Sequence, residues 1–253
     1  MNFRNFVAVF LFVIFGVSEM DAQSYELGKV TVAELKEKEN PKDTTAPATI
    51  LFKKAKTVFT YNKDRGFSAN HIYEFKIKIY KKEGLKWADQ KVRFYIGYET
   101  LNQDLLEFSN AVTYNLENGS IVKTKLDNQG SFKKKVNKFW NEKTITLPNV
   151  KVGSIIEYKY VLKSENIVKL PDFDFQYDIP VRYFEYKTDI PEFYIYKTLL
   201  IGTRKIETDS KITSGNQSFN DEYNRSSSIS YKQISAFYSG KDIPALTKEP
   251  YVD

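Results

Sequence analysis

The chain has 253 residues, a formal net charge of +6, no cysteine and a single histidine, His71. Hydrophobic residues make up 42% and charged residues 28%, which excludes a disordered polar chain and a bundle of membrane helices. The absence of cysteine excludes disulfides, thiol nucleophiles and thiolate metal sites, and one histidine excludes any site that needs two imidazoles. Aromatic residues are frequent, at 15%, and these favour half-buried pleated sheets.

Residues 1–22 are predicted to be a secretory signal peptide. Arg4 precedes an apolar run of 12 residues, Phe6–Val17, and Ala22 is a small residue suited to the cleavage position. The run is shorter than the roughly 20 residues needed to cross a membrane. An uncleaved anchor and a buried core strand are the alternatives. Cleavage near Ala22 would leave a mature chain of net charge +7, because residues 1–22 carry one base and two acids. The prediction is an exported, periplasmic or envelope-associated protein.

Two short helices are predicted. Thr31 and Glu34 form a capping-box pattern, the residues that follow are good helix formers, and Pro41 ends the run. The stretch Leu101–Phe108 suggests a second short helix.

From about Ile50 onward, apolar residues alternate with polar ones, which is typical of strands. The clearest strand is His71–Tyr80. We expect one face of it to carry Tyr73, Phe75, Ile77 and Ile79, and the opposite face to carry Glu74, Lys76 and Lys78. On this pattern Ile77 lies in the core, whereas Lys76 lies on a face where substitution is tolerated.

Asn118-Gly119 predicts a tight hairpin, since both residues accept positive φ. Further strands are predicted at Val92–Tyr98, Val112–Leu116, Ile121–Lys125, Ser154–Leu162, Val181–Thr188, Glu192–Ile201, Lys205–Thr208 and Ser228–Ile234. Many short strands without a long helix indicate an all-β fold, an antiparallel β-sandwich. Residues 23–253 read as a single domain, and Ser214–Ser228 as a mobile loop or hairpin tip.

Two groups of polar residues could carry chemistry. His71 could act as a general base, but no GxSxG elbow accompanies it, and a structural histidine at a strand edge is the favoured interpretation. Asp172 and Asp174 would share one face of a strand and could bind calcium, yet the rest of a calcium loop is missing. A solvated or lysine-paired pair of carboxylates is favoured.

The lysine clusters Lys53-Lys54, Lys81-Lys82 and Lys133–Lys135 could contact an anionic surface, although lysines also keep exposed sheet faces soluble. Rows of aromatic residues, at 183–186 and 193–196, could form a stacking platform for sugar, but more often they are sandwich core and its flank. The sequence therefore predicts no catalytic, cofactor-binding or metal-binding residues, and no cofactor.

Four segments together resemble a known family, the domain of unknown function 3857 (DUF3857). They are ELKEKENPKDTTAPATILFKKAK at 34–56, YNLENGSIVKTKL at 114–126, LPNVKVGSIIEYKYVLKS at 147–164 and FQYDIPVRYFEYKTDIPEFYIYK at 175–197. The resemblance extends over roughly residues 28–253. It implies an N-terminal β domain that precedes a transglutaminase-like domain in exported proteins of Gram-negative bacteria.

The resemblance also implies that catalysis belongs to the downstream domain, which uses Cys, His and Asp. None of these catalytic residues maps onto this chain, because it has no cysteine and His71 lies in the N-terminal region. Residues from about 240 to 253 resemble the connector to that domain, so the chain is expected to be a fragment of a longer protein. The predicted function is a non-catalytic module that positions the transglutaminase-like domain or its substrate. The alternative is a binding module for envelope glycan or an anionic surface, with no nucleic acid partner.

Overall fold

A computed structural model describes residues 25–202, 204–220 and 225–246. The predicted signal peptide, residues 1–22, lies outside the described residues. The all-β prediction is confirmed, since strands account for 56% of the described residues and helices for 6%. No helix among the described residues is long and apolar enough to cross a membrane.

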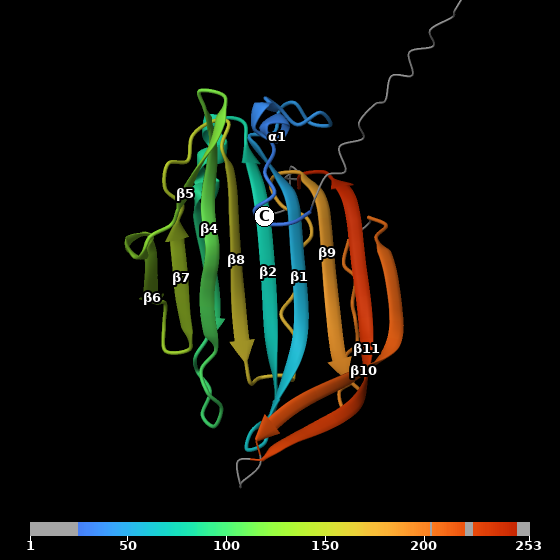
Figure 1. Ribbon diagram of the computed structural model, residues 1–253. Coiled ribbons are helices and arrows are strands. Elements are labelled where there is room, and N and C mark those ends of the chain that lie inside the picture. The colour runs from blue at the N-terminus through green and yellow to red at the C-terminus, as the bar shows by residue number, and fades with distance from the viewer. Residues whose placement is uncertain (1–24, 203, 221–224, 247–253) are drawn as a thin grey trace, which may run out of the picture.

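The elements form a large sheet, a small sheet and three short helical segments (Figure 1). The large sheet contains β1 (Ala48–Asn62), β2 (Gly66–Ile79), β4 (Leu105–Glu117), β5 (Ser120–Lys125), β8 (Ile155–Ser164), β9 (Val181–Pro191), β10 (Glu207–Asn220) and β11 (Ser226–Ile243). The small sheet contains β3 (Asp89–Tyr95), β6 (Ser131–Lys135) and β7 (Trp140–Thr146). The helical segments are α1 (Val32–Lys36) and the 3-10 helices η1 (Lys82–Ala88) and η2 (Asn128–Gly130).

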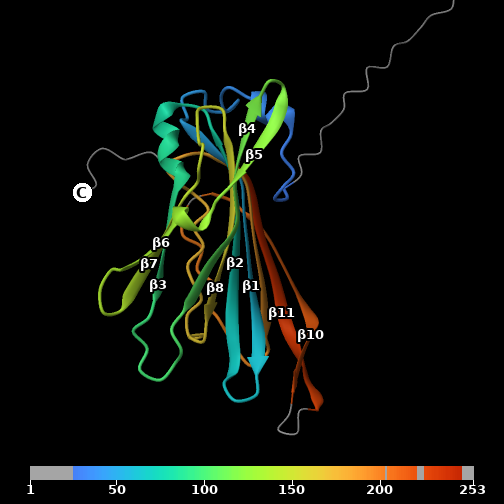
Figure 2. The same cartoon turned by 60° about the vertical axis from the view of Figure 1, so that its left-hand side comes forward.

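The strand order of the large sheet is β10-β11-β9-β1-β2-β8-β4-β5, and that of the small sheet is β3-β7-β6. All pairs are antiparallel except β1 and β9, which run parallel, so the large sheet is mixed. The sequence did not predict this parallel pair. Figure 2 shows the small sheet packed on one side of the large sheet and the N-terminal segment with α1 on the other.

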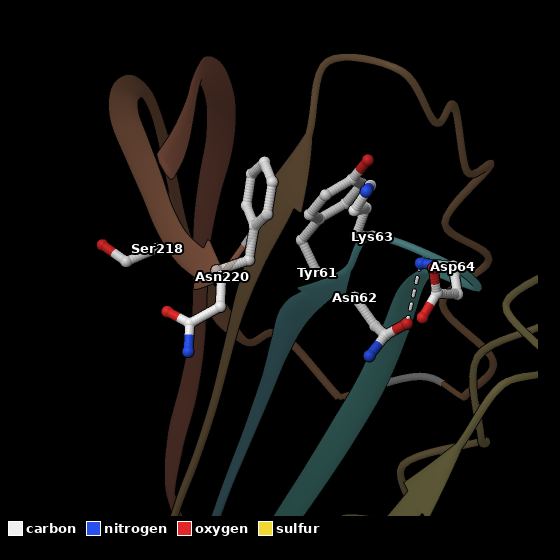
Figure 3. A pocket seen from close by; sticks show the side chains of 7 residues that line it. Tyr61, Asn62, Lys63, Asp64, Ser218 and Asn220 are labelled. Carbon is white, nitrogen blue, oxygen red and sulfur yellow. Dashed lines mark hydrogen bonds between the residues drawn. The ribbon is translucent and has the colours of Figure 1, made fainter. Parts of the chain in front are cut away.

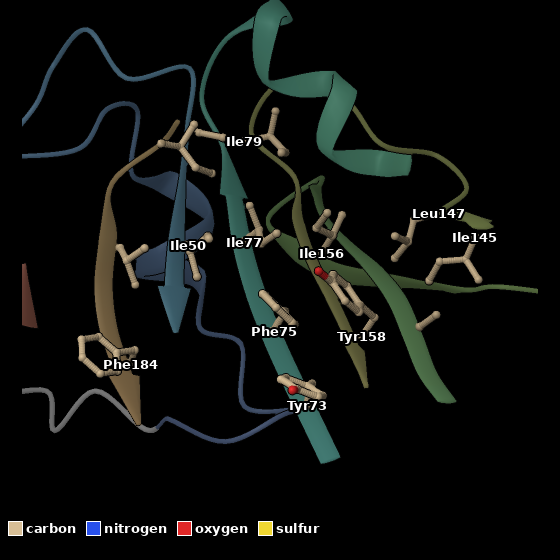
Figure 4. Packing of buried hydrophobic residues seen from close by; sticks show 14 of the residues in the cluster. Ile50, Tyr73, Phe75, Ile77, Ile79, Ile145, Leu147, Ile156, Tyr158 and Phe184 are labelled. Carbon is tan, nitrogen blue, oxygen red and sulfur yellow. The ribbon is translucent and has the colours of Figure 1, made fainter. Parts of the chain in front are cut away.

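The main hydrophobic core lies between the large sheet and the small sheet (Figure 4). Tyr73, Phe75, Ile77 and Ile79 of β2 all point into it, as their alternation predicted. The core also contains Ile50 of β1, Ile156 and Tyr158 of β8, Phe184 of β9, Ile145 of β7, and Leu147, which follows β7. Burying large apolar side chains contributes roughly 1.5–3 kcal/mol each, so this layer supplies much of the stability.

The opposite face of β2 is also buried at the end where α1 lies. Leu35 of α1 packs against Leu51, Val112 and Ile155 of the sheet. Thr31 caps α1 and forms the predicted capping box with Glu34. The helix therefore covers a part of the sheet that the sequence pattern assigned to solvent.

Two lysines beneath α1 correct the sequence interpretation. Lys76 and Lys78 do point away from the main core, but both are fully buried. The ammonium of Lys76 donates to the carboxylate of Glu34, at 2.7 Å, and to a backbone carbonyl, and that of Lys78 donates to the carbonyl oxygens of Leu35 and Gly153. The alternation of apolar and polar residues in β2 resembles that of a strand with one solvent-exposed face. The lysines on its polar face donate hydrogen bonds to backbone carbonyls instead of to water.

Two predicted elements are wrong. The stretch Leu101–Phe108 is not a helix, because its second half belongs to β4 and pairs with β8, where Phe108 lies opposite Tyr160. Glu192–Ile201 is not a strand, because β9 ends at Pro191. Its alternation has another cause: Tyr194 and Tyr196 pack onto Phe59, whereas their neighbours are exposed.

The predicted hairpins are largely confirmed. Asn118 and Gly119 both have positive φ, at 49° and 79°, and join β4 to β5. Strand β10 pairs with β11 along its full length, so residues 214–220 and 226–228 of the predicted loop or hairpin tip are strand. The stretch proposed as a connector from about residue 240 begins inside β11, which continues to Ile243.

The two buried faces of β2 generate a prediction. Ile77→Asp should abolish folding, because an unpaired carboxylate would enter the main core. Lys76→Asp should also destabilise the fold, by about 3–5 kcal/mol, because it removes a buried cation and places a carboxylate beside Glu34 and Glu157. Lys125→Asp, a matched change at an exposed position of β5, should cost no more than about 0.5 kcal/mol. Urea unfolding followed by circular dichroism measures all three, and a stable Lys76→Asp variant would contradict the buried lysine.

Candidate functional site

His71 lies in the interior of β2, which is a central strand, and its side chain is buried. The prediction of a strand-edge histidine is therefore wrong, although the structural role is supported. The imidazole Nδ1 lies 2.9 Å from the hydroxyl of Thr57 on β1, and that hydroxyl lies 3.0 Å from the hydroxyl of Tyr186 on β9. Burial lowers the pKa of His71 to about 4, so the imidazole is neutral at physiological pH. Without access to solvent, it is not placed to exchange protons with a substrate.

Lys53 is the most unusual charged residue of the main core. It is a buried side chain on β1, and its ammonium lies 4.1 Å from the centre of the Phe173 ring and 5.1 Å from that of Tyr177. It donates to the Tyr177 hydroxyl, at 2.6 Å, and to the carbonyl of Asp174. Burial lowers the pKa of Lys53 to about 7. These contacts hold the segment before β9 against the sheet, and the sequence grouped this lysine with surface charges.

Asp172 and Asp174 lie in that same extended segment and not on a strand of either sheet. Both are exposed, and Asp172 pairs with Lys169 at 3.2 Å. Between them Phe173 points inward and stacks on Tyr186. The favoured interpretation of solvated or lysine-paired carboxylates agrees with these contacts. Among the described residues, no group of three or more His, Asp or Glu side chains could hold a metal ion.

The other lysines of the three clusters serve different roles. Lys54 donates to the carbonyl of Tyr25, at 2.9 Å, and lies 3.5 Å from Glu185. Lys81 donates to carbonyls of the loop before β1. Lys82 and the three lysines at 133–135 are exposed, the latter on β6 of the small sheet. The clusters are therefore not parts of one basic surface patch.

The aromatic rows are divided between core and flank, as the sequence favoured. Phe184 and Tyr186 belong to the main core or pack against it, whereas Tyr183 lies on the other face and stacks on Tyr25 with ring centres 3.9 Å apart. Tyr194 stacks on Phe59 in a third hydrophobic cluster. A flat platform of exposed rings is not formed by these residues.

A cavity of about 600 Å³ lies between the turn that joins β1 to β2 and the distal end of β10 (Figure 3). Its wall contains Tyr61, Asn62, Lys63, Asp64, Ser218, Phe219 and Asn220. Asn62 is engaged in the turn, where its side-chain oxygen accepts from the backbone of Asp64 at 3.0 Å. With one carboxylate and no imidazole in its wall, this cavity lacks the acid–base pair of a hydrolytic site.

Glu157 on β8 is a buried carboxylate that the sequence analysis missed. Its Oε2 accepts from the backbone of Gly28, at 2.7 Å, and from the hydroxyl of Tyr114, at 3.0 Å, while its Oε1 has no protein partner. Burial raises the pKa of Glu157, and the cation of Lys76 acts in the opposite direction. Together with the Lys76–Glu34 pair, it holds the N-terminal segment on the sheet. The glutamate within the otherwise largely apolar and aromatic run IIEYKY is the sequence signal that could have identified this buried carboxylate.

The chain belongs to the DUF3857 family. The sequence model of the family described as "Domain of Unknown Function with solved-structure structure (DUF3857)" matches residues 67–227, more than half of the sequence. No curated protein matches the chain. Among solved structures, it is similar to the crystal structure of a "putative protease" from Parabacteroides distasonis ATCC 8503, with a TM-score of 0.51 and 13% identity. The match covers 82% of this chain but 38% of that protein. At this identity the similarity concerns the fold alone.

The buried imidazole predicts a pH dependence of stability. Because the folded state lowers the pKa of His71 from 6.5 to about 4, acidification through this window protonates the unfolded chain first and lowers the free energy of unfolding. The loss should reach about 3 kcal/mol below pH 4. His71→Gln should remove this part of the pH dependence, and Thr57→Val, which keeps the imidazole, should retain it. Urea unfolding between pH 4 and 7.5 measures the slopes, and equal slopes for the wild type and His71→Gln would refute the assignment.

Proposed function

We propose that this chain is the non-catalytic β module of an exported transglutaminase-like protein. In this role it packs beside the catalytic domain and positions that domain or its substrate. The observation that carries the proposal is the structural similarity to a much longer protein, described as a putative protease, of which the match covers 38%. The proposed location is the periplasm or the cell envelope, after cleavage of the signal peptide near Ala22.

The chemistry of the described residues supports a non-catalytic role. The chain has no thiol that could form an acyl-enzyme, and its single imidazole is buried against Thr57. A serine-based mechanism would need a base within hydrogen-bond reach of an accessible hydroxyl, and His71 does not offer this.

An exposed apolar segment supports packing against a further domain. Leu199, Leu200 and Ile201 follow one another between β9 and β10 and are 75%, 53% and 79% exposed. Three consecutive exposed aliphatic residues are unfavourable on a free surface and are typical of an interaction site.

The first test concerns the neighbouring domain. The reading frame beyond Asp253 should encode a transglutaminase-like domain with Cys, His and Asp. That domain, produced separately, should bind residues 23–253 in isothermal titration calorimetry. Leu199→Ser combined with Ile201→Ser should weaken the association by about tenfold or more, since two buried aliphatic contacts are lost.

Val168→Ser, at a residue that is 88% exposed in another loop, serves as the matched control and should leave the association unchanged. A frame that encodes no such domain, or an association that the double variant does not weaken, would contradict this arrangement.

The second test concerns activity. Purified residues 23–253 should neither incorporate an amine label into a glutamine substrate nor cleave casein, because acyl transfer of this kind requires a thiolate. His71→Gln should give the same result. Turnover that disappears in the His71→Gln variant would make the chain an enzyme and overturn the proposal.

A further inference from the structure

We propose that a second cavity, at the end of the large sheet near α1, binds the anionic group of a carboxylated or phosphorylated sugar. The cavity has a volume of about 610 Å³. Four cations and two carboxylates line it, together with Tyr25 and three prolines. This binding function goes beyond the positioning role proposed above and stands on different residues.

Segments that are far apart in the sequence meet at this cavity. Figure 1 shows the start of β9 and the end of β11 side by side at the end of the sheet where α1 lies. The pairing of Val181 with Ile243 joins the two strands there. The loop from Asn40 to Asp43, Arg204 from the connection before β10, and Tyr25 complete the wall.

Two of the four cations already have partners. Lys42 pairs with Asp242 at 2.6 Å, and Arg182 pairs with Glu37 at 2.7 Å. The other carboxylate of the wall, Asp43, accepts from the backbone and hydroxyl of Thr45. Hydrogen bonds from Thr45 leave Asp43 charged, so the wall together with Glu37 sets four cations against three carboxylates and keeps one positive charge in excess.

Arg204 and Lys241 carry that uncompensated charge. Both are exposed, and neither pairs with an acid among the described residues. Two cations that face one concave site from different strands and loops attract an anion, and the fork of Arg204 matches a carboxylate or phosphate. An anion is therefore the ligand group that the charges favour.

The remaining wall indicates a sugar as the carrier of the anion. Tyr25 is held in place by stacking on Tyr183, so it offers a fixed aromatic surface without further loss of freedom. The carboxylates of Asp43 and Asp242 retain acceptor capacity for hydroxyl groups. The prolines at 41, 180 and 244 have no backbone N–H, so they offer a peptide backbone fewer donors.

Calorimetric titration of residues 23–253 at low salt tests the proposal with three probes. Trigalacturonic acid and glucose 6-phosphate represent the two sources of the anion, and an acetylated dipeptide with a free carboxylate represents a peptide ligand. The sugar that binds with the higher affinity shows whether the anionic group is a carboxylate or a phosphate. At least one sugar should bind, and the methyl ester of trigalacturonic acid, which keeps the hydroxyls and removes the charge, should not.

Arg204→Gln combined with Lys241→Gln should weaken sugar binding by about tenfold or more, because charge-assisted hydrogen bonds are lost. Lys133→Gln combined with Lys134→Gln removes the same charge from β6 and should change the affinity less than twofold. Both pairs of residues are exposed, so folding is preserved. Equal weakening by the two double variants, an absence of sugar binding, or tighter binding of the dipeptide would each overturn the proposal. None of these outcomes depends on the neighbouring domain, so the two proposals fail separately.

Discussion

The fold depends on an apolar ladder that crosses the middle of the large sheet. Ile50 of β1 lies opposite Ile77 of β2, which lies opposite Ile156 of β8, and all three are fully buried. On the outer side of β1, Val181 of β9 continues the ladder through the parallel pair. Because the β1–β2 hairpin is joined here to β8 and β9, which lie much later in the chain, this packing fixes the order of the sheet and supports everything attached to it.

The face behind the ladder is held by charges rather than by hydrocarbon alone. Lys76 and Glu157 lie under the N-terminal segment, to which Glu34 belongs, and ionised groups persist there only if they are paired or hydrogen-bonded. Lys53 has the same function on the main-core face, where it holds the segment before β9. Both charged groups fasten irregular chain to the sheet, which explains why a sheet with so many strands needs few regular elements to cover it.

The same construction places the features that suggest function at the margins of the molecule. The interior uses its histidine and its buried lysines for structure, so chemistry in the core is disfavoured. The exposed aliphatic run at 199–201 and the cationic cavity beside Arg204 both involve the connection between β9 and β10. A surface for a neighbouring domain and a site for a charged ligand would then share one connection, an arrangement suited to a module that positions other molecules.

The sequence by itself determined the all-β class, the capped helix, the hairpin at Asn118-Gly119 and the apolar face of β2. These are local patterns, in which a capping residue, a turn residue or alternation of side chains decides the conformation of its own neighbourhood. Only the tertiary structure decided that β1 and β9 run parallel, that residues 105–108 join β4, and that Lys76, Lys53 and Glu157 are buried. Those outcomes depend on which distant segment covers a residue, and a period-2 pattern is the same whether its polar face meets water or the carbonyls of a covering segment.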